Sequence, residues 1–149
     1  MKHFLLTLLA CLAIASCSAF DDDYFAEHQS KTPELVSNKF QVHQKSAEYF
    51  AHKVSFDDNV TRSVSSVEPL AHGKDTLLYI VNFSNNNGWI VLSGDKRTES
   101  ILASSKTGQF DLNHLGGSAV WMQEVAEKIY GVKRSNHQDT TSTAYKNWC

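Results

Sequence analysis

Three cysteines carry the most reactive side chains of this 149-residue chain, at Cys11, Cys17 and Cys149. A catalytic thiol needs a helix N-terminus or a cation beside it to favour the thiolate, and nothing in the polar stretch before Cys149 indicates either. His114 has the side chain of a general base, but the sequence assigns it no nucleophile and no orienting acid. The chain also lacks the nucleophile-elbow, zinc-protease, phosphate-loop and CxxC motifs. We therefore expect no enzymatic chemistry, no cofactor and no metal site.

The N-terminal residues predict export. A positive start precedes an apolar run over residues 4–15, which is the composition of a secretory signal and is shorter than the roughly 20 residues that span a bilayer. The ending Ile14-Ala15-Ser16-Cys17 resembles a bacterial lipobox. We favour removal of residues 1–16 and lipidation of Cys17, and a plain signal peptide cut near Ala19 is the alternative.

A lipidated chain would be anchored to a membrane through Cys17 and exported as a periplasmic or outer-membrane and cell-surface lipoprotein. Residues 18–23 include three aspartates and resemble surface-export signals of some Gram-negative lipoproteins, although a solvated spacer explains them equally well. If Cys17 is acylated, Cys149 is the one thiol of the mature chain, so no disulfide can form within it.

The composition predicts one small soluble domain. The chain is 42% hydrophobic and 20% charged, as is usual for a globular core. We place a flexible tether at residues 17–37, the domain at residues 38–131 and a mobile polar tail at residues 132–149. The net charge of −2 and pI near 6.4 leave no basic surface for nucleic acid, so we exclude that partner.

The stretch over residues 77–110 predicts an antiparallel β-meander. Three short runs of β-branched and aromatic residues are separated there by Asn, Gly and Ser clusters, which is the pattern of strands joined by tight turns. Residues 64–70 add a fourth strand. The fold expected is therefore α+β, with a twisted antiparallel meander sheet of about four strands and two packing helices.

The two helices are predicted from their apolar periodicity. The first covers residues 38–54, with Ser37 as its N-cap. The second covers residues 118–130, with Gly117 or Ser118 at its start and Gly131 at its end. Their apolar stripes are Phe40, Ala47, Phe50 and Val54 in the first helix, and Trp121, Val125 and Ile129 in the second.

The first meander strand is apolar on both faces. Leu78 and Ile80 alternate with Tyr79 and Val81, whereas a sheet half in water shows a cleaner alternation of apolar and polar residues. Either a helix covers each face, or one face awaits another protein. In the second case Leu78, Ile80 and Trp89 form a docking face.

The meander also carries three motifs in a fixed order. They are Tyr79-Ile80-Val81-Asn82, then Gly88-Trp89-Ile90-Val91-Leu92-Ser93-Gly94-Asp95-Lys96-Arg97, then Ile101-Leu102 followed by Gly108-Gln109-Phe110-Asp111. This arrangement resembles the prodomain of streptopain-type cysteine proteases, clearly over residues 77–123 and more loosely from residue 38. A generic meander would not require Ser93, Asp95 and Arg97 together.

The resemblance implies a function. In that family the prodomain precedes a catalytic domain and blocks it until the prodomain is cut away. This chain stops about where a catalytic domain would begin, so we expect a free-standing, streptopain-inhibitor-like lipoprotein. It would inhibit a streptopain-like, papain-fold cysteine protease in trans, as a prodomain mimic that blocks the active-site cleft, and it would need no small-molecule substrate.

By the family pattern, the loop that reaches the cleft lies between the last meander strand and the second helix, at residues 111–118. Where the family has an asparagine late in this loop, the sequence has Gly117. The resemblance therefore implies a protease-contacting loop made of Asn113, His114, Leu115, Gly116 and Gly117. The alternative is that the two glycines only turn the chain into the helix.

Three other functions compete with inhibition. The first is a surface lipoprotein binding module that has a prodomain-like fold and no protease target, which exposed aromatics around Trp89 and Trp121 would favour. The second is a folded remnant of a protease without a role. An enzyme of a new type comes last, because the sequence builds no nucleophile, metal site or cofactor cradle.

Overall fold

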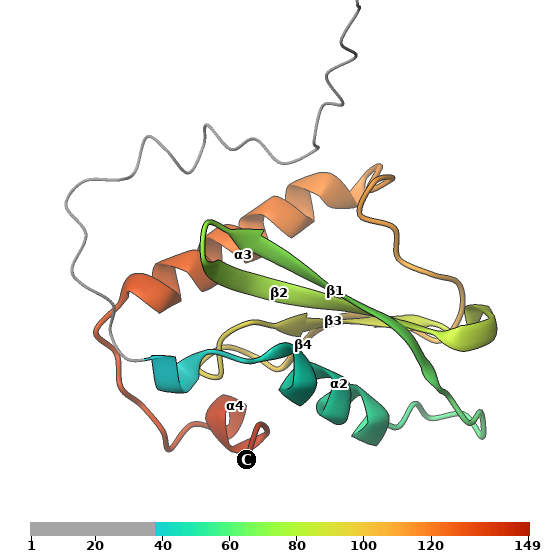
Figure 1. Cartoon of the computed structure of the whole chain (residues 1–149), viewed down its shortest axis with the longest axis horizontal. Helices are drawn as coiled ribbons and strands as arrows, with labels where there is room; N and C mark the ends of the chain where they lie inside the picture. Colours follow the sequence, from blue (N-terminus) through green and yellow to red (C-terminus); the bar gives the residue numbers. More distant parts are fainter. Residues whose placement is uncertain (1–37) are drawn as a thin grey trace, which may run out of the picture.

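The computed structural model describes residues 38–149, so the predicted signal, Cys17 and the tether lie outside the described residues. Its centre is one four-stranded sheet in which every neighbouring pair is antiparallel and the strands lie in chain order (Figure 1). The strands are β1 (Val64–His72), β2 (Asp75–Phe83), β3 (Trp89–Ser93) and β4 (Ile101–Ser105). The predicted α+β meander is confirmed.

The turn between β2 and β3 has the residues that its backbone requires. It contains a short 3-10 helix, η2 (Ser84–Asn86), in which Asn85 and Asn86 have φ of 60° and 56°. Gly88 follows with φ of 101°, and a Cβ there would lie 2.1 Å from the carbonyl oxygen of Ser105. Asn and Gly tolerate positive φ, and only Gly fits so close to the backbone at the end of β4.

The first helix is shorter than predicted. Residues before it form a 3-10 turn, η1 (Asn38–Phe40), and the helix α2 spans Gln44–Lys53, with His43 rather than Ser37 as its N-cap. The cause is a competing backbone pairing, because Val42 donates to the carbonyl of Gly94 at 3.0 Å and so cannot join a helix. Phe40 is buried all the same.

The second helix is longer than predicted. It is α3 (Ser118–Arg134), and it continues through Gly131 for another turn. Gly131 lies within the helix, and no atom outside the helix backbone is near its Cβ position. Two residues later, two hydrogen bonds hold the Lys133 side chain in the core. Tertiary contacts therefore outweigh the weak helix propensity of glycine.

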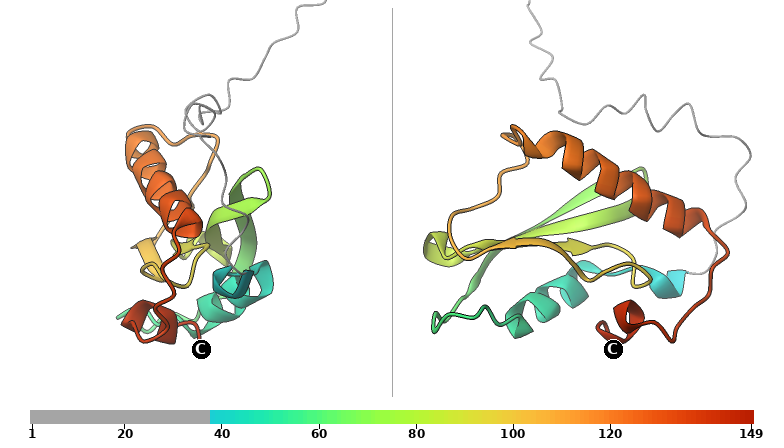
Figure 2. Two further views of the ribbon diagram at one scale, coloured as in Figure 1. Left: turned by 90° about the vertical axis from the view of Figure 1, so that its left-hand side faces the viewer. Right: turned by 180° about the vertical axis from the view of Figure 1, so that it is seen from behind.

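Each face of the sheet is covered by a helix. α3 lies on one face and α2 on the other (Figure 2). The α3-side core consists of Leu77, Leu78, Ile80, Val91, Leu115, Met122, Ala126 and Ile129. The α2-side core consists of Val42, Ala47, Ala51, Tyr79, Val81, Phe83, Ile90 and Leu92.

This arrangement corrects the docking-face hypothesis. Leu78 and Ile80 are fully buried under α3, and Trp89 is half-buried beside them. The apolar pattern on both faces of β2 therefore reflects a strand between two helices. Burying a Leu or Ile side chain contributes about 1.5–3 kcal/mol, so these residues stabilise the fold.

The C-terminal residues also differ from the expected mobile tail. Residues 132–134 belong to α3, and the remainder, residues 135–149, which we name the strap, includes the helical turn α4 (Thr143–Lys146). The Tyr145 ring meets Phe40 edge-on at 5.8 Å, and the Trp148 ring lies 4.6 Å from that of Phe50 on α2.

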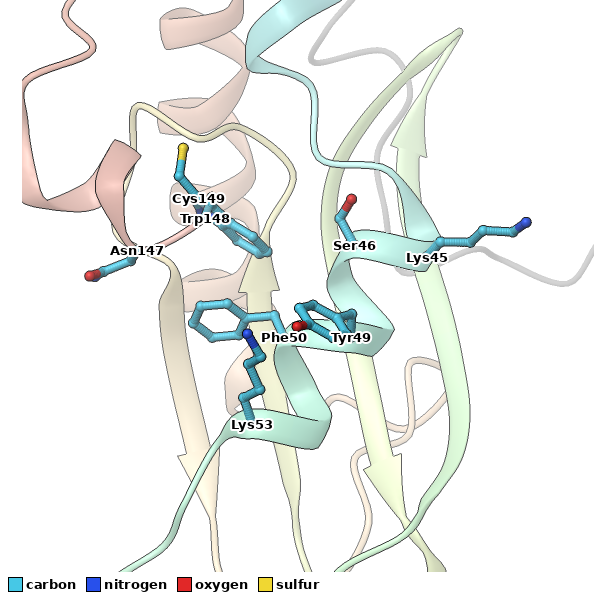
Figure 3. A pocket seen from close by; sticks show the side chains of 8 residues that line it. All are labelled: Lys45, Ser46, Tyr49, Phe50, Lys53, Asn147, Trp148 and Cys149. Atoms are coloured by element: carbon cyan, nitrogen blue, oxygen red, sulfur yellow. The ribbon is translucent and has the colours of Figure 1, made fainter.

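The strap leaves a pocket of about 270 Å³ against α2, shown in Figure 3. Phe50 of α2 and Trp148 of the strap are among the residues that line it, and Lys53 extends beside the Phe50 ring. Within residues 38–149, no helix combines the length and the apolar content needed to cross a bilayer.

Candidate functional site

The loop over residues 111–117 connects the end of the sheet to α3, and its start is held by Asn82 of β2. The Asn82 side chain accepts a hydrogen bond from the backbone N–H of Phe110 at 2.8 Å and donates to the carbonyl of the same residue at 3.0 Å. The carboxamide thus takes the place of a neighbouring strand. The Phe110 ring packs at 4.8 Å against that of Trp89, which fixes where the loop begins.

The loop is organised around Asp111. One carboxylate oxygen accepts from the backbone N–H of Asn113 at 2.8 Å and from its side-chain amide at 3.2 Å. The other lies 2.7 Å from the Nδ1 of His114, and the Asp111 carbonyl accepts from the backbone N–H of His114 at 3.2 Å. These hydrogen bonds, that to His114 first, hold the pKa of Asp111 below its usual value.

The second half of the loop turns into the fold. Leu115 is buried in the α3-side core, and its carbonyl accepts from the backbone N–H of Ser118 at 2.9 Å. Gly116 has φ of 52°, a conformation that favours glycine, whereas Gly117 has the helical φ of −67°. No atom lies within 4 Å of a Cβ placed at Gly117, so the asparagine of the family pattern would fit there.

The structure divides the five predicted loop residues into two groups. Asn113 and His114 are exposed at the tip, with 83% of the His114 side chain accessible. Leu115 points into the core and is not free to touch a partner. Gly116 and Gly117 are exposed and turn the chain into α3, so the alternative interpretation of the glycines agrees with their backbone geometry.

The described residues show no grouping of His, Cys, Asp or Glu side chains able to hold a metal ion. Cys149 is an exposed free thiol, and its Sγ lies 3.6 Å from the carbonyl of Tyr145. The exposed groups of the 111–117 loop are the backbone of its glycines, the Asn113 amide, the His114 imidazole and the Asp111 carboxylate.

Comparison with known proteins identifies the family. The family model described as Spi protease inhibitor matches residues 22–129. The chain belongs to this family. The chain is also 31% identical over 138 residues to streptopain of Streptococcus pyogenes, and equally so to the streptopains of its serotypes M1 and M18 (strain MGAS8232).

Each of these matches covers 92% of this chain and 32% of the relative. The Spi-family chain thus spans about a third of the length of the curated relatives it matches. No solved structure matches it.

The Spi-family motif around Asp95 holds the fold together. Asp95 is 1% exposed and accepts two hydrogen bonds from the Arg97 guanidinium, at 2.9 Å and 2.8 Å, and one from the Arg97 backbone N–H at 3.0 Å. The Nζ of Lys133 on α3 lies 4.0 Å from the same carboxylate. Such a bidentate, charge-assisted pair is among the stronger polar contacts.

The same cluster ties distant segments of the Spi-family chain. Lys133 donates to the side chain of Gln41 at 2.6 Å and to the carbonyl of Gly94 at 3.0 Å. Arg97 donates to the strap carbonyls of Ser135 and His137 at 3.3 Å and 2.9 Å. Burial lowers the pKa of Lys133, and the nearby Asp95 charge opposes this shift.

Sequence reasoning recognised Ser93, Asp95 and Arg97 as a specific combination but missed what the motif does. Ser93 accepts from the Asp95 backbone N–H at 3.0 Å, and Gly94 lies so close to β2 that a Cβ would sit 2.3 Å from the carbonyl of Thr76. The missed members are Gln41 and Lys133, because their separation in sequence hides their contact.

Proposed function

We propose that this chain inhibits a streptopain-like, papain-fold cysteine protease in trans, as a prodomain mimic whose 111–117 loop enters the active-site cleft. The observation that carries the proposal is membership of the Spi protease inhibitor family over residues 22–129. The similarity of the chain to streptopains supports a protease of that type as the target.

The geometry of the loop supports this role. Asn113 and His114 are exposed, while the Asp111 carboxylate accepts from the Asn113 backbone N–H at 2.8 Å and lies 2.7 Å from the His114 Nδ1. Asn82 and Leu115 fix the two ends of the loop to the core. A segment already held in one conformation loses less entropy when it binds, and it makes a poorer substrate because it cannot extend freely.

The test is a titration of the purified domain against a streptopain-type protease from the same genome. We expect stoichiometric loss of activity at concentrations near that of the enzyme. Absence of inhibition at micromolar excess would refute the proposal.

Two variants then locate the inhibitory element. Replacing residues 113–117 with a Gly/Ser linker should weaken inhibition strongly. Val60→Ala is the matched control, because Val60 is an exposed hydrophobic residue in a separate loop and its change should leave inhibition intact. Equal inhibition by the wild type and the loop replacement would remove the loop from the mechanism.

The binding-module alternative needs exposed aromatics, and the structure provides fewer than expected. Trp89 and Trp121 are half-buried and pack against the α3-side core. Among the described aromatic residues, Tyr49 on α2 is the most exposed, at 62%. Inhibition is therefore the better supported function.

Export and anchoring through Cys17 complete the proposal. A lipid anchor would hold the inhibitor at a periplasmic or outer-surface membrane, where it could meet a secreted protease. Metabolic labelling with a radioactive fatty acid tests this directly. The wild type should be labelled, and Cys17→Ser should not.

A further inference from the structure

The two edges of the sheet are protected to different degrees. An edge strand exposes unpaired backbone groups that can pair with another chain, and proteins block this with proline, charge or irregular pairing. β1 has all three, namely Pro69, Glu68 and register shifts between Val64 and Ser66 and between Leu70 and Ala71. β4, with the sequence ILASS, contains neither proline nor charge.

β4 is also partly apolar and only partly covered. Ile101, Leu102 and Ala103 are half-buried, and Ser104 is exposed. The register shift of β4 falls at its start, opposite Val91 and Leu92, so residues 103–105 pair regularly with β3. In the view from behind, β4 lies at the front of the sheet, with α3 above it and α2 below (Figure 2).

The hydrogen-bond alternation of the sheet shows which groups of β4 face outward. Phe83 donates to the carbonyl of Gly88 and Gly94 donates to that of Leu77, so even-numbered residues of β3 bond to β2 and odd-numbered ones to β4. The partners of Trp89 and Val91 are Ser105 and Ala103. Ser104, between them, therefore directs its N–H and C=O away from the sheet.

The same alternation places Pro69 at the equivalent position of the other edge. Pro69 is opposite Tyr79, which bonds to β3, so the missing N–H of Pro69 is one that would face outward. Among residues 38–149, no backbone hydrogen bond outside the sheet involves Ser104. Within residues 38–149, one edge is therefore blocked at this position and the other is open.

We propose that the β4 edge is a second docking element, at which an extended, uncharged segment of the target protease adds to the sheet as a fifth strand. The inference rests on the proposed function. The protease is the expected occupant because of the interface area that it needs. A stable complex buries about 1,200–2,000 Å² in total, and the short tip at Asn113 and His114 cannot supply this area alone. β4 leads through residues 106–110 into that loop, so both elements form one continuous stretch of chain.

Strand addition would use both the outward backbone groups of Ser104 and the apolar side chains of β4. Main-chain hydrogen bonds to Ser104 would provide affinity, and the half-buried Ile101, Leu102 and Ala103 would contact alternate side chains of the added strand. Because β4 carries no charge, a charged partner segment would lose hydration without compensation. The segment that fits is therefore extended and uncharged.

The test introduces into β4 a proline or a charge, which are the features that protect the edge of β1. Ser104→Pro removes the outward N–H, and Ser104→Ala is the matched control that keeps it. Ser104→Lys, which keeps the backbone but adds an edge charge, provides a second block if the proline variant does not fold. Thermal melts followed by circular dichroism establish folding, and affinity is measured by calorimetry against a streptopain-type protease whose catalytic cysteine is replaced by alanine.

We expect Ser104→Pro to weaken binding about tenfold, as the loss of one or two net hydrogen bonds implies. Ser104→Lys should weaken binding as well, because its charge opposes pairing of the edge with another strand. Ser104→Ala should bind as the wild type does. Equal affinity of all folded variants would overturn the proposal. So would a wild-type dimer that Ser104→Pro dissociates while protease affinity stays unchanged, because the edge would then accept a second copy of this chain.

The same measurements can refute the proposed inhibition independently of the proposed edge contact. A wild type that binds the protease without inhibiting it would refute inhibition, and the comparison of Ser104 variants would still decide the edge by affinity. A wild type that does not bind the protease at all would refute both.

Discussion

The turn after β3 and the loop after β4 are built on the same local chemistry. In each, an aspartate accepts from the backbone N–H two residues later, at 3.0 Å from Arg97 to Asp95 and at 2.8 Å from Asn113 to Asp111. In each, the second carboxylate oxygen meets a basic side chain, that of Arg97 at 2.8 Å or His114 at 2.7 Å. Sequence and turn chemistry alone would assign the two segments the same role.

Their surroundings give them different roles. The side chains of Asp95 and Arg97 are 2% and 3% exposed, whereas those of Asp111 and His114 are 53% and 83% exposed. In the first turn the polar groups join β3, α3 and the strap. In the loop they hold a short segment in one shape at the surface. The buried aspartate turn thus serves the fold, and the exposed one shapes the loop that we propose as the contact.

The largest effect expected from this comparison is at Asp95. Asp95→Ala removes the carboxylate that faces the buried charges of Arg97 and Lys133, and breaking such a buried ion pair costs about 3–5 kcal/mol. Urea denaturation followed by circular dichroism should show this loss, and Asp111→Ala should change the midpoint little. If Asp95→Ala gives no folded protein, Asp95→Asn keeps a turn acceptor and should show a smaller loss. Equal stability of the Asp95 and Asp111 variants would break the comparison.

The next effect is at Asn82, which joins the buried and exposed regions. Asn82→Ala leaves the backbone groups of Phe110 without partners, at a cost of about 1–3 kcal/mol, and frees the start of the loop. We expect both a lower denaturation midpoint and weaker inhibition. Ser66→Ala is the control, because Ser66 meets the Asn82 amide only at 3.5 Å. Unchanged inhibition by folded Asn82→Ala would show that the loop needs no anchor.

A smaller effect is expected at Asp111 itself. Asp111→Asn retains an acceptor for the Asn113 backbone but loses the charge that holds His114, so inhibition should weaken several-fold while stability at neutral pH falls only slightly. Asp139→Asn is a close control, because Asp139 in the strap accepts from the backbone N–H of Thr141 at 2.7 Å in the same geometry. Equal inhibition by the two variants would count against the loop as the contact.

The smallest expected effect is on folding stability at acidic pH. Hydrogen bonds, that from His114 first, lower the pKa of Asp111 from its ordinary 3.8. A carboxyl whose pKa is depressed by folding contributes stability above its unfolded pKa and loses it as the pH falls through the folded value. The wild type should therefore lose slightly more stability below about pH 4 than Asp111→Asn does. Thermal melts across this range measure the difference, and parallel curves would contradict it.

The sheet could be predicted from sequence because its signals are local. Residues 77–110 alternate strand-forming runs with Asn and Gly turns, and the backbone of Asn85, Asn86 and Gly88 shows why those residue types stand there. The second helix also followed from periodicity, although its end at Arg134 did not. Contacts of Lys133 with Gln41 and Gly94 extend it, and such contacts leave no local pattern.

The candidate loop was only partly predictable. The family motifs indicated a loop at residues 111–118, and the structure has a loop there, between β4 and α3, with Asn113 and His114 exposed. Leu115 could not be assigned to the core from sequence, because a single apolar residue in a polar loop fits either role. The docking face at Leu78 and Ile80 was wrong for a related reason, since an apolar strand face looks the same whether a helix of the chain or a partner covers it.

The sequence by itself determined the meander, its turns, and the combination of Ser93, Asp95 and Arg97 that links the chain to its family. These depend on backbone preferences and on residues close together in the chain. Only the tertiary structure decided which of two similar aspartate turns is buried, which faces of the sheet are closed and which edge is open. Those properties depend on what distant segments cover, and burial, unlike turn geometry, is a property of the whole fold.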